Sequence, residues 1–196
     1  DRVAIAEQVE DPKKAKGLVK REVVRVVTPG TLINSNLLSE KSNNFFAALA
    51  QVGQVIGLAF LDLTTGEFFV SEFTHERDLL NEIYRLHPAE FLTSEKFKAK
   101  HTGLFEEIRQ TYPFLINCQA DWHFEHQTAY DFLIQHFKVY NLDGFGLRGM
   151  VAAINAAGAL LRYLQEALCL PIHQIQEIRA YSTSHFMALD RMTQRN

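Results

Sequence analysis

The stretch 55–73 constrains the fold most, because it predicts two buried strands joined by a tight turn. Its first half is almost wholly apolar, which is typical of a strand covered on both faces. Thr64, Thr65 and Gly66 predict the turn, since glycine reaches positive φ without a steric clash. The second half alternates more between apolar and polar residues, as a strand with two different faces does. A hairpin this apolar must be buried, so we expect the rest of the chain to fold over it.

Further strands and helices surround this hairpin. Apolar periodicity predicts one strand before it and alternating helices and short strands after it. Thr74 and Thr128 are the expected N-caps of two of the helices. The predicted strands are 45–52, 90–93, 114–118 and a strand-like exit at 175–182, and the predicted helices are 75–86, 104–112, 129–138 and 149–168. This order predicts an α/β fold with a mixed five-stranded sheet flanked by helices, in the ribonuclease-H-like arrangement.

The N-terminal region predicts a piece of a neighbouring domain. A strand at 3–6, a helix that begins at Pro12 and ends at Gly17, and a strand at 19–27 form a β-α-β unit without further strands to pair with. Polar, turn-forming residues follow and predict a linker. The chain does not begin with Met, so we expect it to be part of a longer protein.

The composition supports a packed core and argues against a membrane span. Hydrophobic residues make up 47% of the 196, which suits one domain of about 150 residues with extensions. The apolar helix at 149–168 contains Arg162 and Glu166 and falls short of about 18 unbroken apolar residues. Cys118 and Cys169 lie far apart and are expected to be buried small hydrophobes. Their spacing suits a reducing compartment, and no signal peptide is recognisable.

The charge is uneven along the chain. Residues 1–30 hold seven Lys/Arg and five acidic residues, net +2, whereas the remainder holds 13 basic and 18 acidic residues, net −5, within an overall charge of −3. Lys13, Lys14 and Lys16 could contact phosphate, but a solvated helix face is the favoured interpretation of such a run. The many phenylalanines are expected to form core rather than a base-stacking platform, because single-strand binders pair aromatics with positive charge.

Asp62, at the end of the first hairpin strand, is the sharpest candidate for chemistry. Ribonuclease-H-like nucleases place a carboxylate on this strand to help hold two metal ions, and Glu82 and Asp143 are the available partners. The alternative, which the following turn signal favours, is that Asp62 begins the turn and bonds to nearby backbone N–H groups. His123 and His126 form only half of a zinc site, so a solvated loop is the favoured interpretation there.

Several runs of the chain resemble the MutS family. The run VAIAEQVEDPKKAKGLVKREVVRVVTPGT at 3–31 resembles the end of the family's mismatch-binding domain. LDLTTGEF at 61–68 is similar to the start of its connector domain, and the loop GFG at 144–146 and the helix AAGALLRYL at 156–164 resemble the later part. LDRMTQRN at 189–196 is similar to the beginning of the lever and core domain. The resemblance therefore extends over the whole chain.

The resemblance implies four segments. These are the tail of mismatch-binding domain I at 1–31, a linker at 32–44, connector domain II at 45–185 and the start of lever and core domain III at 186–196. It implies a DNA mismatch-repair protein of the bacterial cytoplasm, namely a homodimeric ATPase that clamps mismatched DNA and recruits MutL. The connector would join the DNA-reading end to the ATPase end and offer MutL a docking surface.

The family's two activities are not expected within this chain. Its mismatch-reading motif, Gly-x-Phe-Tyr-Glu, and its phosphate-binding loop, Gly-x-x-x-x-Gly-Lys-Ser/Thr, are both absent from the sequence. ATP and Mg²⁺ are therefore expected to bind elsewhere in the intact protein, and no cofactor or chemistry is assigned to this chain. For MutL docking, the resemblance and the polar face of the helix 129–138 together favour Asp131, Gln135 and Lys138, with Tyr130 at the edge of the buried side.

Overall fold

The predicted hairpin lies at the centre of the fold. The structure, a computed structural model, describes residues 2–9, 21–28 and 45–183. Strands β3 (Phe45–Val52), β4 (Val55–Asp62) and β5 (Glu67–Phe73) pair antiparallel in chain order, so that β4 is bonded on both edges. The buried hairpin is thereby confirmed.

The sheet has six strands, in the order β7-β6-β3-β4-β5-β8, so the expected number of five is wrong. Strand β6 (Glu90–Ser94) runs parallel to β3, and β7 (Leu115–Gln119) runs parallel to β6. The sixth strand, β8 (Arg179–Ala180), runs parallel to β5 and has only two residues. It lies within the predicted strand-like exit at 175–182, which was not counted in the sheet. Backbone bonds such as Tyr181 N–H to Val70 O (3.0 Å) hold it against β5, and such bonds leave no side-chain pattern that would reveal the pairing.

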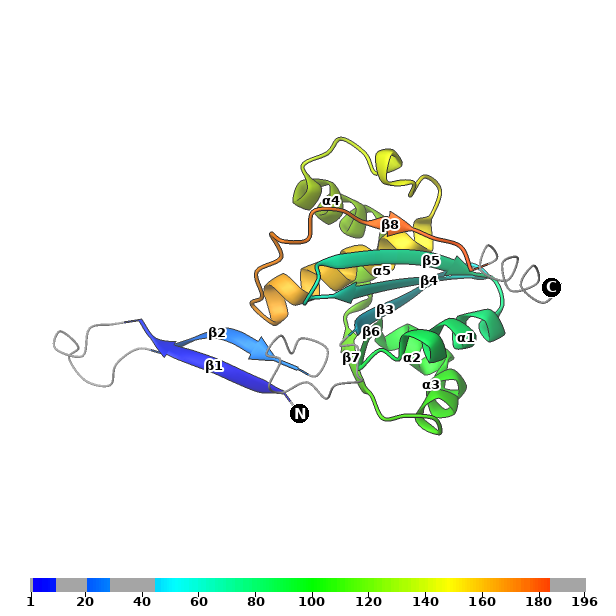
Figure 1. The fold of residues 1–196 in the computed structure, drawn as a ribbon, viewed down its shortest axis with the longest axis horizontal. Coiled ribbons are helices and arrows are strands. Elements are labelled where there is room, and N and C mark those ends of the chain that lie inside the picture. The colour runs from blue at the N-terminus through cyan, green and yellow to red at the C-terminus, as the bar shows by residue number, and fades with distance from the viewer. Residues whose placement is uncertain (1, 10–20, 29–44, 184–196) are drawn as a thin grey trace, which may run out of the picture.

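Helices cover both faces of this sheet (Figure 1). One layer consists of α1 (Glu76–Leu86), α2 (Glu95–Lys100) and α3 (Thr102–Arg109), which pack on the side chains of Leu49, Leu58 and Phe91. The other layer consists of α4 (His126–Phe137) and α5 (Val151–Arg162), which pack on Phe46, Leu61 and Phe68. Cover on both faces explains why β3 and β4 are apolar almost throughout. The mixed α/β architecture agrees with the prediction, whereas its ribonuclease-H-like detail stays a prediction.

Both expected helix caps are wrong. Helix α1 begins one residue later than expected, and its N-cap is His75 rather than Thr74, because the chain still bends at Thr74 after β5. Helix α4 begins earlier than expected, with Glu125 as its N-cap instead of Thr128. The short 3₁₀ helix η3 (Asp121–Phe124) has already turned the chain there, so that Ala129 N–H bonds to Glu125 O at 2.9 Å.

The long apolar helix changes its winding before it ends. Helix α5 continues as one π-helical turn, η5 (Tyr163–Ala167), where an uninterrupted helix was expected. Its first turn crosses β4 at Gly57, where an added Cβ would lie 2.2 Å from the Ala152 carbonyl carbon. On its other side Gly158 meets α4, and a Cβ there would lie 2.5 Å from Ala129 O. Small residues therefore let α5 pack backbone to backbone against both the sheet and α4.

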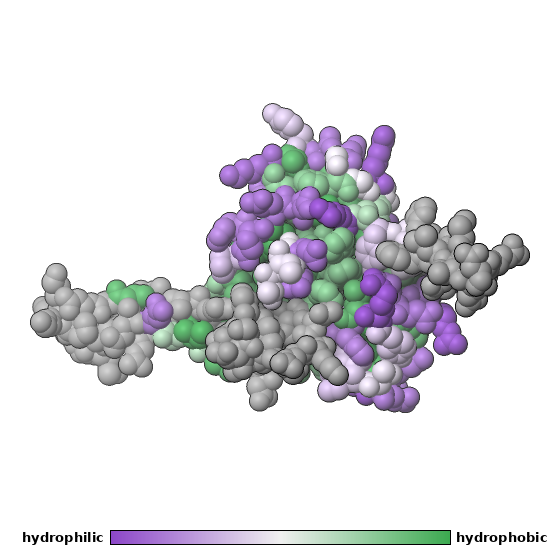
Figure 2. Space-filling view, viewed as in Figure 1, coloured by the Kyte–Doolittle hydropathy of each residue, from purple (hydrophilic) through white to green (hydrophobic). Residues whose placement is uncertain are grey.

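The N-terminal strands form a separate hairpin. Strand β1 (Val3–Gln8) pairs antiparallel with β2 (Arg21–Val27) in a two-stranded sheet that projects from the larger domain (Figure 1). The helix expected from Pro12 to Gly17 lies outside the described residues. Figure 2 shows apolar side chains at the surface of this hairpin, and Val3 is 58% exposed.

The two cysteines differ in their surroundings. Cys118 on β7 is partly buried, whereas Cys169 is exposed and has a positive φ of 52° just after the π turn. Burial of Cys169 is therefore a wrong prediction, because the left-handed backbone at this position turns its side chain outward between the buried Leu168 and Leu170.

Candidate interaction surfaces

The four predicted docking residues lie on α4 or at its end. Helical spacing places Asp131, Gln135 and Lys138 along one face, with Gln135 and Lys138 exposed and Asp131 partly buried. Asp131 Oδ1 accepts a hydrogen bond from Gln127 on the same helix (2.8 Å). Tyr130 is partly buried, and its hydroxyl accepts from Leu142 N–H at 3.4 Å. We call these four residues the α4 surface; Gln135 and Lys138 are its exposed members.

An exposed tryptophan flanks the α4 surface, and sequence reasoning did not select it. Trp122 on η3 is 48% exposed and stacks on His123 with 3.8 Å between ring centroids. The Arg162 guanidinium lies 5.4 Å from the Trp122 ring centre and 5.1 Å from that of Phe132 on α4. Burial, and next the charge of Arg162, lower the pKa of His123. Aromatic and arginine side chains dominate protein interfaces, and this is the only Trp in the sequence, which was the available signal.

A hollow of about 450 Å³ borders the other end of the α4 surface. It is lined by Phe137 and Lys138 from α4 and by the segment 170–176, which returns from α5. His136 Nε2 lies 2.6 Å from Ile175 O and fixes this segment to the helix. The sequence gives no hint of this hollow, because its two walls are more than thirty residues apart.

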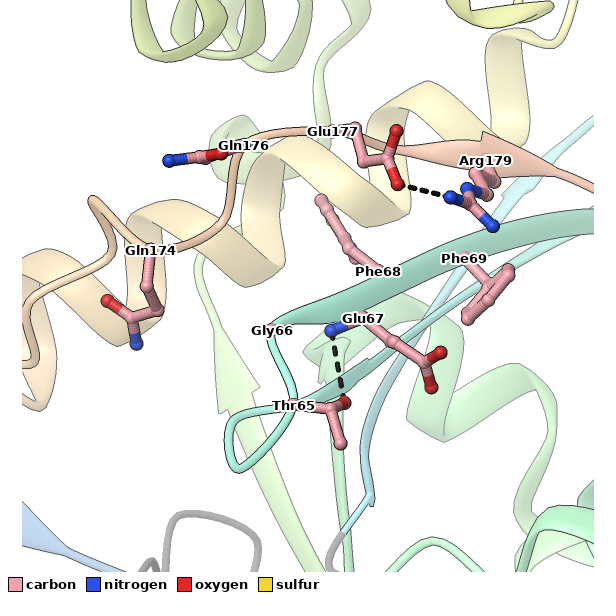
Figure 3. A pocket seen from close by; sticks show the side chains of 9 residues that line it. All are labelled: Thr65, Gly66, Glu67, Phe68, Phe69, Gln174, Gln176, Glu177 and Arg179. Atoms are coloured by element: carbon pink, nitrogen blue, oxygen red, sulfur yellow. Dashed lines mark hydrogen bonds and ion pairs between the residues drawn. The ribbon is translucent and has the colours of Figure 1, made fainter.

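A second hollow, of about 530 Å³, lies between the β4–β5 turn and the segment before β8 (Figure 3). Of its charged residues Glu67, Glu177 and Arg179, the last two pair with each other at 2.5 Å. Gly66 has a φ of 77°, and a Cβ there would lie 3.3 Å from Gln174 O, so glycine lets the segment pass close to the turn. This arrangement holds the segment that leads into β8 next to the β4–β5 turn.

Asp62 is a turn residue. Its Oδ1 accepts hydrogen bonds from the backbone N–H groups of Thr64 (2.8 Å) and Thr65 (3.4 Å), which confirms the favoured alternative. Its supposed metal partners lie in opposite layers: Glu82 is on α1, whereas Asp143 follows Leu142 in the α4–α5 layer.

The described residues thus do not assemble the nuclease site. Glu82 accepts hydrogen bonds from Arg85 Nε (3.1 Å) and from the Tyr181 hydroxyl (2.9 Å). Within the described ranges, no group of three or more His, Cys, Asp or Glu side chains could hold a metal ion. His126 Nδ1 lies 3.0 Å from Asn155 Oδ1, and His123 stacks on Trp122, so the two histidines do not act as a pair of ligands.

The N-terminal hairpin contacts the large domain at the end of α5. Val26 N–H on β2 donates to Leu168 O at 2.9 Å, and the Arg2 guanidinium donates to the Tyr163 hydroxyl at 2.8 Å. Val26 also packs against the core of the α4–α5 layer. Burial raises the pKa of Tyr163 to about 12, while Arg2 opposes this shift and Glu90 adds to it. These contacts, which we call the joint, could not be foreseen from the sequence. Lys13, Lys14 and Lys16 lie outside the described residues.

The fold and its surfaces together define a class: an α/β domain that carries a piece of a second domain on the end of one helix. Comparison with known proteins gives the family. The profile described as "MutS domain II" matches residues 44–176, and that of "MutS domain I" matches residues 1–36. The chain belongs to the MutS family.

Individual relatives agree with this assignment. The chain is 78% identical over 195 residues to the DNA mismatch repair protein MutS of Protochlamydia amoebophila, covering all of this chain and 23% of that protein. It is 44% identical to the MutS of Chlamydia abortus and 39% identical to that of Lachnoclostridium phytofermentans, again over the whole chain and over 24% and 21% of those proteins. The chain thus spans about a quarter of the length of these relatives. No helix in the described part of the chain has the length and apolar character to cross a membrane.

Proposed function

We propose that this chain is the connector region of a MutS-type mismatch-repair protein, together with the end of its mismatch-binding domain. The division into 1–31, 32–44, 45–185 and 186–196 belongs to this proposal. The observation that carries it is the succession of two MutS domain matches along one chain, with a hydrogen-bonded joint where the two parts meet. A connector must transmit a movement of one neighbouring domain to the other. Hydrogen bonds between the N-terminal hairpin and the end of α5 support that role, because they couple the two parts mechanically.

The packing of the domain suits mechanical transmission. The sheet is buried on both faces, and α5 touches β4 and α4 through backbone contacts at Gly57 and Gly158. Close-packed interiors transmit displacement because they have little free volume to absorb it. The connector is therefore expected to move as one body when either neighbour moves.

The chemistry of the intact protein is proposed to lie outside this chain. Mismatched DNA, ATP with Mg²⁺ and homodimerisation are assigned to other domains, in the bacterial cytoplasm, and the connector itself is proposed to catalyse nothing. Contact of Lys13, Lys14 and Lys16 with DNA phosphate stays a prediction.

The partner of the α4 surface is proposed to be MutL. The surface has the exposed Gln135 and Lys138 and the partly buried Asp131 on a helix whose opposite side, Ala129 and Leu133, is buried. Trp122 beside it is proposed as an apolar anchor. Because the Asp131 carboxylate bonds to Gln127 on the same helix and Lys138 is exposed, both can be altered without disturbing the core.

Charge reversal in the intact protein tests this assignment. The double variant Asp131→Lys with Lys138→Glu is expected to weaken MutL binding about tenfold, while mismatch affinity stays as in the wild type. The matched control, Lys98→Glu with Glu106→Lys, reverses two exposed charges in the α1–α3 layer and is expected to change neither binding. Unchanged MutL binding by the α4 variant would remove the α4 surface from the proposal.

A further inference from the structure

The joint is built at the one place where α5 departs from α-helical winding. In an α-helix, each residue advances by about 100°, so residues five apart lie roughly 140° apart around the axis. In the π turn, Leu168 N–H bonds to Tyr163 O at 3.2 Å, five residues back. This bond brings residues 163 and 168 closer to the same side of the helix than α-helical winding would.

Both residues that the π turn aligns hold the N-terminal hairpin. The buried Tyr163, 2% exposed, presents its hydroxyl to Arg2, and the Leu168 carbonyl accepts from Val26. That carbonyl lies at the end of the helix, where carbonyl groups lack partners within the helix. The π turn therefore gives the helix end two hydrogen-bond acceptors for the N-terminal hairpin, which we call the seat.

The two anchor points belong to different strands of the hairpin but to the same end of it. Val26 on β2 pairs with Ala4, and Arg2 lies just before β1. Further out, Ile5 and Val23 are 40% and 51% exposed, so the hairpin projects from the seat rather than lying along the connector. One anchor would leave the hairpin free to swivel, whereas anchors on both strands fix its direction.

We infer that Tyr163 is a positioning residue whose hydroxyl, together with the Leu168 carbonyl at the end of the same π turn, sets the orientation of the mismatch-binding domain on the connector. The Arg2–Tyr163 and Val26–Leu168 contacts act as one unit. This goes beyond the proposed docking function and holds whether or not the α4 surface binds MutL.

Tyr163→Phe separates the hydroxyl from the packing of the ring. The ring keeps its contact with Phe46, whose centroid lies 5.7 Å away, and loses only the bond to Arg2. Tyr112→Phe is the matched control, since it also removes a buried hydroxyl, one for which the described residues provide no hydrogen-bond partner.

Amide hydrogen exchange of the complete chain, followed by NMR, gives the readout. In Tyr163→Phe, exchange at the Val26 amide is expected to accelerate about tenfold or more, because a bond to a charged group is lost next to it. Exchange at the core amides of Leu49 and Leu58 is expected to stay as in the wild type. A merely structural role would instead accelerate the core amides and Val26 together, and that result would overturn the inference.

A double variant tests whether Arg2 and Tyr163 act on Val26 through their mutual hydrogen bond. Arg2→Ala combined with Tyr163→Phe is expected to accelerate Val26 exchange no further than Arg2→Ala alone. Acceleration equal to the product of the two single effects would show independent groups and would overturn the inference. The inference would also be overturned if Tyr163→Phe accelerated exchange at the Val26 amide no more than Tyr112→Phe does.

Discussion

The two helical layers of the connector are packed in different ways. The α1–α3 layer is joined to the sheet by aromatic rings, with Phe91 lying 5.9 Å from Phe105 and 5.0 Å from Phe114 between centroids. In the α4–α5 layer, backbone contacts join α5 to β4 of the sheet at Gly57 and join α5 to α4 at Gly158. Large side chains hold a helix away from a sheet and can readjust, whereas backbone contacts leave no freedom. The comparison indicates that the α4–α5 layer is the rigid one, and this layer also carries the joint and the α4 surface.

The largest effect is expected from filling the contact beneath α5. Gly57→Ala would place a methyl group 2.2 Å from the Ala152 backbone, so α5 must shift, at a cost of about 3 kcal/mol in the free energy of unfolding. Chemical denaturation of the complete chain measures it. Gly103→Ala, in α3 where the added Cβ meets nothing within 4 Å, is the control, and it should be neutral or stabilise by up to about 1 kcal/mol. Equal behaviour of the two variants would refute the difference between the layers.

The buried carboxylate of the α1–α3 layer should give the next largest effect. Glu82 accepts from Arg85 and from Tyr181, and burial, followed by the nearby Glu82, raises the pKa of Tyr181. Glu82→Gln keeps the shape and removes the charge, and is expected to lower the free energy of unfolding by about 2 kcal/mol. The exposed Glu106→Gln should change it by less than about 0.5 kcal/mol. A loss at Glu106 as large as that at Glu82 would contradict this assignment.

A smaller effect separates a cap seen in the structure from one expected from the sequence alone. Ser94 Oγ accepts from Phe97 N–H at 3.0 Å and caps α2, so Ser94→Ala should cost about 1 kcal/mol in the same denaturation measurement. Thr74→Ala should have almost no effect, because α1 begins after His75. A larger loss of stability in Thr74→Ala than in Ser94→Ala would instead indicate that Thr74 caps α1.

The smallest effect concerns pH. Burial lowers the pKa of His101 below its ordinary value of 6.5, with Nε2 of its ring held 2.7 Å from Gln51 Oε1. A depressed pKa in the folded state favours the neutral ring, so this contribution to stability is complete above about pH 6.5 and declines as the pH falls below that value. We expect the free energy of unfolding to fall between about pH 7.5 and about pH 5.5. This fall, measured by chemical denaturation at both pH values, should be smaller in His101→Gln than in the wild type. An equal loss in both proteins would exclude His101 as the group responsible.

Much of the fold could be predicted because its patterns are local. The apolar run of β4, the glycine turn and the helical period of α4 each lie within a few residues, and that period also placed Asp131 and Gln135 on one face. Helix α2 was missed because six residues are too few to show a period. Strand β8 lies within the predicted strand-like exit at 175–182, but its pairing with β5 was not predicted, because backbone bonds that any side chain allows hold its two residues.

The contacts between distant segments could not be predicted at all. The joint links Arg2 to Tyr163, 161 positions apart, and depends on a π turn for which no local signal was recognised. Trp122 beside the α4 surface and the hollow beyond Lys138 likewise arise only when separate elements meet. The resemblance to MutS supplied the domain succession, because it rests on long runs rather than on periodicity.

The most direct test of the proposal that the α4–α5 layer carries the docking surface is a hydrogen-exchange footprint of MutL on the intact protein. The account predicts that MutL protects backbone amides in α4 (His126–Phe137) and in η3 beside Trp122, while amides of α1 and α3 exchange as in the free protein. Protection confined to α1 and α3, with α4 unchanged, would contradict it.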